Sequence, residues 1–144
     1  MSLHEKMNDY LANQIAMYIK LHNLHWYIKG NDFFTLHAKL EELYNATAKT
    51  IDEVAERMLM IEASPVASLQ GAQKLTKVKE LDDKPIGSEE AIKVLEKDVE
   101  WWISSTKELI TLADSENDTG TVDMFSELLG YYEKLNWMLK SYLA

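Results

Sequence analysis

Apolar side chains recur at steps of three and four residues along most of the chain, which is the spacing of one face of an α-helix. The first such stripe covers residues 3 to about 28, and a second covers residues 33 to about 61. Gly30 lies between them and suits a position just past a helix end, while either of the two residues after it can cap the next helix. We therefore expect two long helices joined by a short turn.

Residues 65–88 interrupt this pattern, because they contain both prolines of the chain, two of its five glycines and a lysine-rich polar stretch. The remaining expected elements are a short helix near residues 68–75, a third long helix from Ser88 to about residue 112 or 113, a turn over residues 114–120 and a fourth long helix from about residue 121 to 142. A long crossover between the second and third of four helices predicts an all-α four-helix bundle, formed by residues 1–144 as a single domain.

Composition adds mainly exclusions. Apolar residues make up 47% of the chain and charged residues 27%, which is typical of a globular protein. The absence of cysteine excludes disulfides, zinc–thiolate sites, iron–sulfur clusters and thiol nucleophiles. With 15 Lys and Arg against 24 Asp and Glu, the net charge of -9 argues against a main affinity for nucleic acid or an anionic bilayer. No apolar run is long enough to span a membrane and the first ten residues lack a signal-peptide core, so we expect a cytoplasmic protein.

Three of the four histidines and a run of acids lie between residues 22 and 57. Each alone has an ordinary explanation, as a packed histidine or as part of a solvated face. In a helix, however, His37, Glu41, Asp52 and Glu56 would share a stripe roughly 100° wide. His37 and Asp52 would still be about 22 Å apart along the axis, so one metal ion could not bind both.

Two copies of the second helix, packed antiparallel about a two-fold axis, would remove this separation. The short turn folds the first helix back, so His25, His37 and Glu41 of one chain would meet Asp52 and Glu56 of the other. The position of the axis depends on whether His37 or Glu41 faces Asp52. Imidazoles and carboxylates without sulfur suit Fe(II), with Mn(II) or Zn(II) as competitors. The sequence thus predicts a metal site shared across a dimer interface.

These residues resemble the signature of the Dps family, the DNA-protection-during-starvation proteins or mini-ferritins. The resemblance is carried by His22-Asn23-Leu24-His25-Trp26-Tyr27-Ile28-Lys29-Gly30, by Asn31-Asp32-Phe33-Phe34-Thr35-Leu36-His37 and by Asp52-Glu53-Val54-Ala55-Glu56-Arg57. The combined pattern N-x-H-W, a glycine four residues on, F-F-x-x-H and D-x-x-A-E-R keeps a fixed spacing, and the likeness extends over nearly the whole chain. It implies a ferritin-like four-helix bundle with a short extra helix in the crossover, assembled into a hollow homo-dodecameric shell.

The resemblance also implies an activity. Members of the family are ferroxidases that oxidise Fe(II) with hydrogen peroxide, which is typically preferred, or with dioxygen, and store the ferric mineral inside the shell. This protects the cell from oxidative damage. By position, His25 and His37 match the family's histidine ligands, and Asp52 and Glu56 match the catalytic ligands from the partner subunit. Glu56 is a candidate bridge if the site holds two irons rather than one.

Three further positions depart from the family pattern or have a second explanation. Glu41 stands where the family has an acidic ligand, commonly aspartate. Trp26 either shapes the pocket beside His25 or packs at the interface. Where relatives often have two glycines before Ser-Pro, this chain has Glu62 and Ala63, so we expect the second helix to continue slightly further.

The acidic residues in and next to the turn over residues 114–120 match the place where the family has acidic three-fold pores that attract cations. We expect Asp118 and Asp123, and then Asp114, to line such a pore; the ordinary alternative is a solvated turn with Asp118 as a helix cap. Family members that bind DNA use lysine-rich terminal extensions, and the ends of this sequence have none, so we expect no appreciable DNA binding. The competing hypotheses are a DNA-coating nucleoid protein and a non-catalytic helical interaction module.

Overall fold

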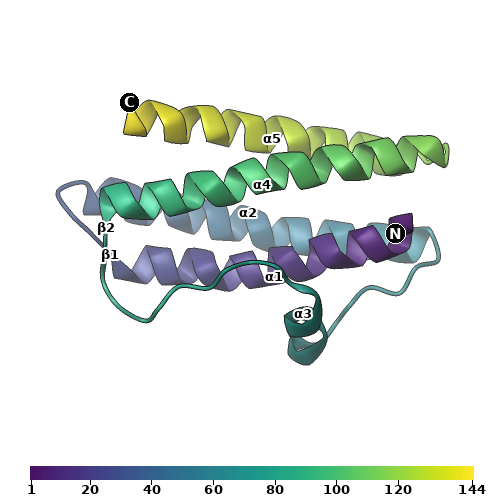
Figure 1. The fold of residues 1–144 in the computed structure, drawn as a ribbon, viewed down its shortest axis with the longest axis horizontal. Helices are drawn as coiled ribbons and strands as arrows, with labels where there is room; N and C mark the ends of the chain where they lie inside the picture. The colour runs from purple at the N-terminus through teal and green to yellow at the C-terminus, as the bar shows by residue number, and fades with distance from the viewer. The chain divides into compact units, whose positions relative to one another are not determined.

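The computed structural model describes residues 1–144 throughout. Its elements, in chain order, are α1 (Leu3–Tyr27), β1 (Ile28–Lys29), α2 (Phe33–Met60), α3 (Leu69–Leu75), β2 (Ile86–Gly87), α4 (Ser88–Ser115) and α5 (Thr119–Leu143) (Figure 1). The chain divides into two compact units: residues 4–88 form one, and residues 1–3 with 89–144 form the other. Four long helices and a short one in the crossover confirm the all-α prediction. None of these helices is both long and apolar enough to cross a membrane.

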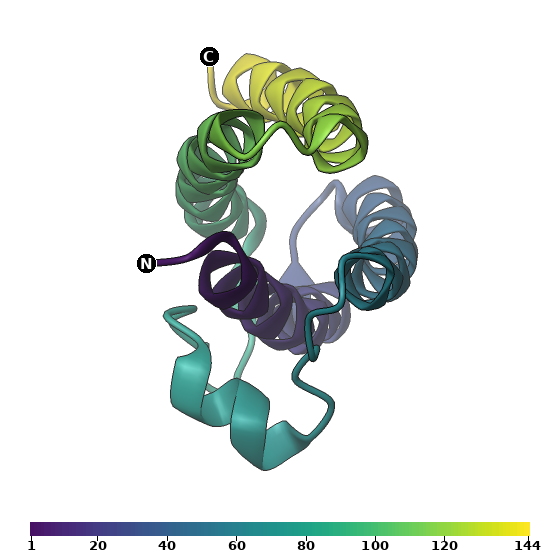
Figure 2. The same ribbon diagram turned by 90° about the vertical axis from the view of Figure 1, so that its right-hand side faces the viewer.

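In the first unit, α1 and α2 lie antiparallel and side by side (Figures 1 and 2). Each buries the apolar stripe that the sequence pattern predicts. The buried apolar residues of α2 are Leu36, Leu40, Leu43, Val54 and Met58, and those of α1 include Met7, Leu11, Leu21 and Leu24. Steps of three, four, ten and eleven residues keep them on one side of each helix, because a turn takes 3.6 residues.

The turn between α1 and α2 contains a contact that the sequence did not predict. Ile28 and Lys29 pair in parallel with Ile86 and Gly87, at the end of the crossover. A pairing of two residues is too short to leave a periodic signal. Gly30 follows with φ +143°, a backbone conformation that side chains rarely adopt, and a Cβ there would lie 2.5 Å from the Ser88 hydroxyl oxygen.

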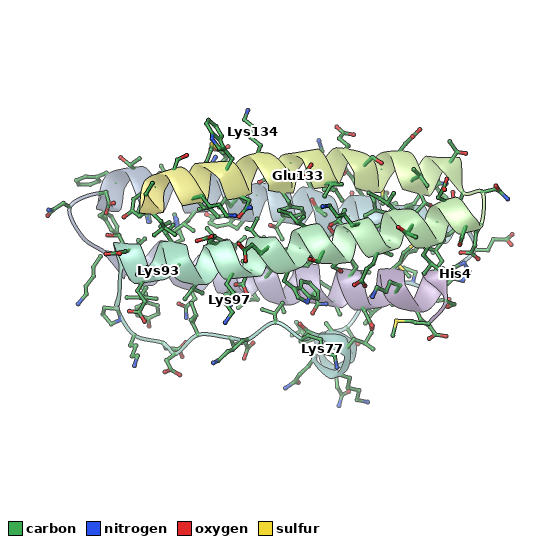
Figure 3. All side chains as sticks on the ribbon, turned by 45° about the horizontal axis from the view of Figure 1, so that its top comes forward. His4, Lys77, Lys93, Lys97, Glu133 and Lys134 are labelled. Carbon is green, nitrogen blue, oxygen red and sulfur yellow. The ribbon has the colours of Figure 1, made fainter.

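Three asparagines of α1 hold the crossover against this helix. Asn13, which is buried, accepts hydrogen bonds from the Thr76 hydroxyl at 2.8 Å and from the Lys77 backbone amide at 2.7 Å. Asn8 and Asn23 bond backbone groups nearer the two ends of the crossover. The crossover therefore runs along α1 and α3 lies beside that helix (Figure 2), with Lys77 just after α3 (Figure 3).

In the second unit, α4 and α5 are antiparallel and joined by a tight turn (Figures 1 and 2). Trp102 of α4 and Tyr132 of α5 are both buried and stack with ring centroids 5.8 Å apart and an interplanar angle of 13°. At the surface, Lys140 and Glu100 form an ion pair at 3.7 Å. Such an exposed pair contributes about 1 kcal/mol at most, so the aromatic packing is the stronger link between the two helices.

The turn between α4 and α5 is shorter than the pattern predicts, and only residues 116–118 lie outside the helices. Asn117 adopts the left-handed conformation, with φ 57°. Its amide and that of Asp118 donate to carbonyl oxygens in the last turn of α4, which is the Schellman arrangement of a helix end. The Asp118 carboxylate then caps α5 by accepting from the Thr121 backbone amide at 3.2 Å.

The expectation that α2 continues further was wrong. The helix ends at Met60, where the chain forms a second Schellman arrangement. The Glu62 amide donates to the Leu59 carbonyl at 3.1 Å, and the Ala63 amide donates to the Met58 carbonyl at 2.8 Å. Glu62 has φ 62°, so a glutamate occupies the left-handed position that glycine fills at low cost.

Candidate metal centre

His25 and His37 face one another across the turn between α1 and α2. The Nδ1 atom of His25 lies 2.7 Å from the His37 carbonyl oxygen, and the Nδ1 atom of His37 lies 2.8 Å from the His25 carbonyl oxygen. Their rings stack with centroids 3.7 Å apart. Because a carbonyl oxygen only accepts, each Nδ1 donates a proton, and in the neutral rings each Nε2 keeps a lone pair. This is the arrangement that orients histidine as a metal ligand.

Glu41 is the acidic residue nearest to this pair. Its Oε1 atom is 4.0 Å from Nε2 of His25, and 56% of its side chain is exposed. On the same face of α2, about three and four turns further along, Asp52 and Glu56 are also exposed. Neither forms an ion pair or a hydrogen bond within the chain, whereas the neighbouring Glu53 pairs with Lys49 at 3.7 Å.

The structure thus brings the two histidines and Glu41 near one another, and it leaves Asp52 and Glu56 further along α2. Within the chain, no three or more His, Asp or Glu side chains converge closely enough to hold a metal ion. The predicted ligands of one chain therefore fall into two separate groups, in agreement with the separation of about 22 Å expected along a helix.

Tyr44 was missed by the sequence analysis. Its ring stacks on His22, with centroids 3.8 Å apart, and meets the edge of the His25 ring at 5.2 Å. Partial burial raises the pKa of the Tyr44 hydroxyl above 10.0, and the negative charge of the neighbouring Glu41 carboxylate adds to this effect. The spacing of three residues between Glu41 and Tyr44 was the available signal, since such residues are neighbours on a helix.

Trp26 is 67% exposed, and its ring lies 5.3 Å from that of His22. The indole therefore stands at the surface beside the aromatic cluster, in a position compatible with either a pocket wall or an interface. Its contact with the cluster runs through His22, since no ring contact joins Trp26 directly to His25.

The acids of the α4–α5 turn have different surroundings. Asp114 and Asp123 are exposed, whereas Asp118 is half-buried and accepts hydrogen bonds from both the amide and the hydroxyl of Thr121. The alternative of Asp118 as a helix cap is therefore confirmed. That Asp114, Asp118 and Asp123 line a cation pore stays a prediction, and of these three Asp114 and Asp123 are the exposed ones.

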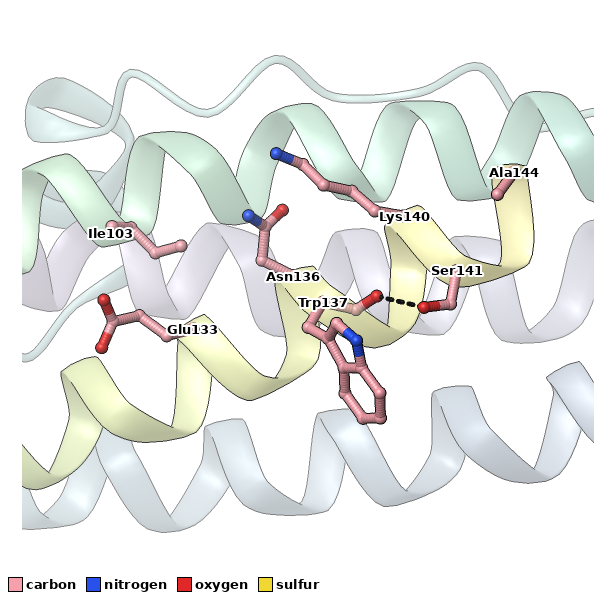
Figure 4. Close-up of a pocket in the computed structure, with 7 residues that line it drawn as sticks. All are labelled: Ile103, Glu133, Asn136, Trp137, Lys140, Ser141 and Ala144. Atoms are coloured by element: carbon pink, nitrogen blue, oxygen red, sulfur yellow. Dashed lines mark hydrogen bonds between the residues drawn. The ribbon is translucent and has the colours of Figure 1, made fainter.

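Two hollows on the surface contain none of the predicted site residues. The first has a volume of about 560 Å³ and lies on the α4–α5 unit (Figure 4). It is lined by Ile103, Glu133, Asn136, Trp137, Lys140, Ser141 and Ala144. The second, of about 370 Å³, lies between α1 and the crossover. Each contains a single carboxylate and no histidine, so neither is a candidate metal site.

Comparisons with known proteins define the class. A ferritin-like domain matches residues 4–144. The chain is 42% identical over 143 residues to General stress protein 20U of Bacillus subtilis, covering 97% of this chain and 96% of that protein. It is 38% identical over 142 residues to DNA protection during starvation protein 2 of Bacillus anthracis, covering 96% and 94%.

Solved structures of Dps proteins have the same fold as this chain. Dps from Staphylococcus aureus is 37% identical and superposes with a TM-score of 0.94, over 99% of this chain and 95% of that one. The Dps protein from Vibrio cholerae, described as one of the ferritin-like diiron-carboxylate proteins, is 34% identical with a TM-score of 0.93, over 99% and 89%. The fold is therefore ferritin-like, and the chain belongs to the Dps family within the ferritin-like proteins.

Proposed function

We propose that this protein is a ferroxidase that oxidises Fe(II) with hydrogen peroxide or dioxygen and stores the ferric product inside a homo-dodecameric shell. The observation that carries the proposal is the pair of partial ligand sets on one helix hairpin. His25 and His37 present two Nε2 lone pairs side by side. Asp52 and Glu56 stand exposed on the same helix with no counter-ion in the chain.

A two-fold axis across α2 would complete the site. The two histidines and Glu41 of one subunit would then bind Fe(II) together with Asp52 and Glu56 of its partner. Nitrogen and carboxylate ligands suit Fe(II), and the anionic carboxylates stabilise the more highly charged Fe(III) product. Two Fe(II) ions supply the two electrons that reduce one hydrogen peroxide to water.

The supply of Fe(II) is the second part of the proposal. Asp114 and Asp123, exposed near the α4–α5 turn, would line cation entrances of the shell. Their charge, within a chain of net charge -9, would raise the local concentration of Fe(II). Because the family match spans residues 4–144, we treat the two compact units as parts of one ferritin-like domain.

Mixing two half-site variants tests whether the site is shared. One variant carries His25→Ala with His37→Ala, and the other carries Asp52→Asn with Glu56→Gln. If each site combines both halves from two subunits, co-expression restores one intact site in every mixed dimer. Random pairing then predicts about one quarter of the wild-type rate of Fe(II) oxidation, although each variant alone is inactive.

The readouts are the oxidation rate and the iron retained in the shell fraction after size-exclusion chromatography. Mixed shells that stay inactive would contradict the shared site, provided that mass spectrometry shows both chains in each shell. Full oxidation by the Asp52 and Glu56 variant alone would contradict the assignment of those two carboxylates.

A further inference from the structure

The last residue of α2 is an exposed methionine. The side chain of Met60 is 69% exposed. The other methionines that lie within helices are buried or half-buried, namely Met7, Met17, Met58, Met124 and Met138. Oxidation of a methionine by peroxide requires access to its sulfur atom. Met60 is therefore the helical methionine whose thioether is open to a small oxidant in solution.

A guanidinium group lies next to this sulfur. Arg57, one turn earlier on α2, donates a long hydrogen bond from Nη1 to the Sδ atom of Met60, at 3.9 Å. Arginine has five N–H donors and stays protonated, so one of them can contact the sulfur while another meets a second acceptor. A thioether is a weak acceptor, and an oxygen atom that arrives beside it is a better one. Arg57 is thus placed to bind a peroxide oxygen next to Met60.

Met60 also lies on the side of α2 that carries two of the predicted ligands. Asp52, Glu56 and Met60 follow one another at steps of four residues, so the sulfur is one turn beyond the Glu56 carboxylate. In the proposed two-fold arrangement, Met60 lies near the end of the helix pair, about 20 Å along α2 from the axis. Hydrogen peroxide that approaches the shared site from this end would meet the thioether.

We propose that Met60 is a peroxide-scavenging residue, and that Arg57 promotes its oxidation to the sulfoxide. The sulfur lone pair attacks one oxygen of hydrogen peroxide, and the O–O bond breaks. Two electrons pass from sulfur to peroxide. The hydroxide that leaves takes the proton of the transferred oxygen, so the products are one sulfoxide and one water. Arg57 donates a charge-assisted hydrogen bond to the leaving oxygen, which stabilises its negative charge. This reaction needs no iron, so it goes beyond the proposed function and does not depend on it.

Peptide mapping by mass spectrometry tests the proposal on the assembled protein without metal. A chelator is present, so that no radicals formed by iron contribute to the oxidation. In dilute hydrogen peroxide, we expect the sulfoxide to form about tenfold faster at Met60 than at Met58, which is fully buried on the same helix. Equal rates at these two positions would overturn the proposal.

Moving the thioether by one position separates the effect of Arg57 from that of exposure. The variant Leu59→Met with Met60→Leu keeps Arg57 and places the thioether where the native side chain is 62% exposed. Residues two apart on a helix do not face each other, so this sulfur lacks the Arg57 contact. We expect its oxidation to be about fivefold slower than that of Met60, a factor typical of one lost hydrogen bond. Equal rates would show that exposure alone controls the reaction, and would overturn the role of Arg57.

Discussion

His25 and His37 anchor each other, because each ring donates its Nδ1 proton to the backbone carbonyl oxygen of the other, at 2.7 and 2.8 Å. This reciprocal pair spans the turn between α1 and α2. Both partners of each hydrogen bond therefore depend on the path of the backbone through that turn. The geometry of the candidate site is set by main-chain atoms as much as by the imidazoles.

The first prediction concerns Gly30. In Gly30→Ala, the new methyl group would meet the Ser88 hydroxyl oxygen at 2.5 Å on a backbone with φ +143°. We expect a loss of about 1–3 kcal/mol in the free energy of unfolding and weaker binding of Co(II), a redox-stable substitute for Fe(II), because the shifted turn separates the two histidines. Chemical denaturation and metal titration measure the two effects.

Gly87→Ala is the control, since Gly87 belongs to the same two-residue pairing and a Cβ there would meet nothing within 4 Å. We expect it to retain metal binding. Equal losses of stability and of Co(II) affinity in both variants would contradict this prediction. They would show that the positive φ of Gly30 is not the reason for glycine at that position.

The second prediction concerns the end of α2. Glu62 has φ 62°, and a residue other than glycine in this conformation is strained by about 1–3 kcal/mol. Glycine relieves this strain, but it also increases the conformational entropy of the unfolded chain. We therefore expect Glu62→Gly to raise the free energy of unfolding by about 1 kcal/mol. Thermal unfolding compares it with Glu62→Ala, which keeps the strained conformation and should give no comparable gain.

The third prediction is the titration of Tyr44. Its pKa is raised above 10.0, first by partial burial and then by the charge of Glu41. A raised pKa in the folded state means that the protonated hydroxyl stabilises the fold fully below about pH 10. That contribution is lost as the pH rises through the raised pKa. The tyrosinate absorbance of the wild-type protein, after subtraction of that of Tyr44→Phe, should therefore rise with a midpoint above pH 10. A titration midpoint below pH 10 would contradict the raised pKa of Tyr44.

The fourth prediction concerns the supply of cations. Asp114→Asn combined with Asp123→Asn removes two exposed carboxylates near the α4–α5 turn, and we expect Fe(II) uptake to slow by about tenfold at low ionic strength. The difference should shrink in high salt, because exposed charges are screened. Asp118→Asn keeps the cap of α5, since asparagine is as good a cap as aspartate, so its uptake rate shows separately whether the charge of Asp118 also attracts Fe(II). A salt-independent effect would point to the fold rather than to steering.

The fifth prediction concerns DNA. Several relatives carry the name DNA protection during starvation protein, including one from Helicobacter pylori that is 35% identical. For this chain, the net charge of -9 means that a strongly acidic protein would have to bind a polyanion, and we expect no band shift at physiological salt near neutral pH. A shift that persists as salt is raised would contradict the electrostatic argument and favour a local DNA-binding surface.

Much of the fold could be predicted from the chain alone. The apolar periodicity predicts the four long helices to within a few residues, and the prolines and glycines of residues 65–88 indicate the crossover. The asparagine contacts that hold this crossover against α1 gave no such signal, because a polar residue within a helix pattern does not indicate its partner. The ring contacts of Tyr44 were equally hidden, because its partners Tyr18, His22 and His25 all lie on the other helix, α1.

The sequence by itself determined the residue types and spacings of the candidate site, because a regular helix converts spacing into position with little freedom. Only the tertiary structure decided which ring nitrogens carry protons, that Glu62 would take a left-handed backbone conformation, and that Asp118 would be a cap. These features depend on which atoms meet across a turn or between two helices. These contacts depend on the packing of the whole chain, and the local spacing of apolar residues does not predict them.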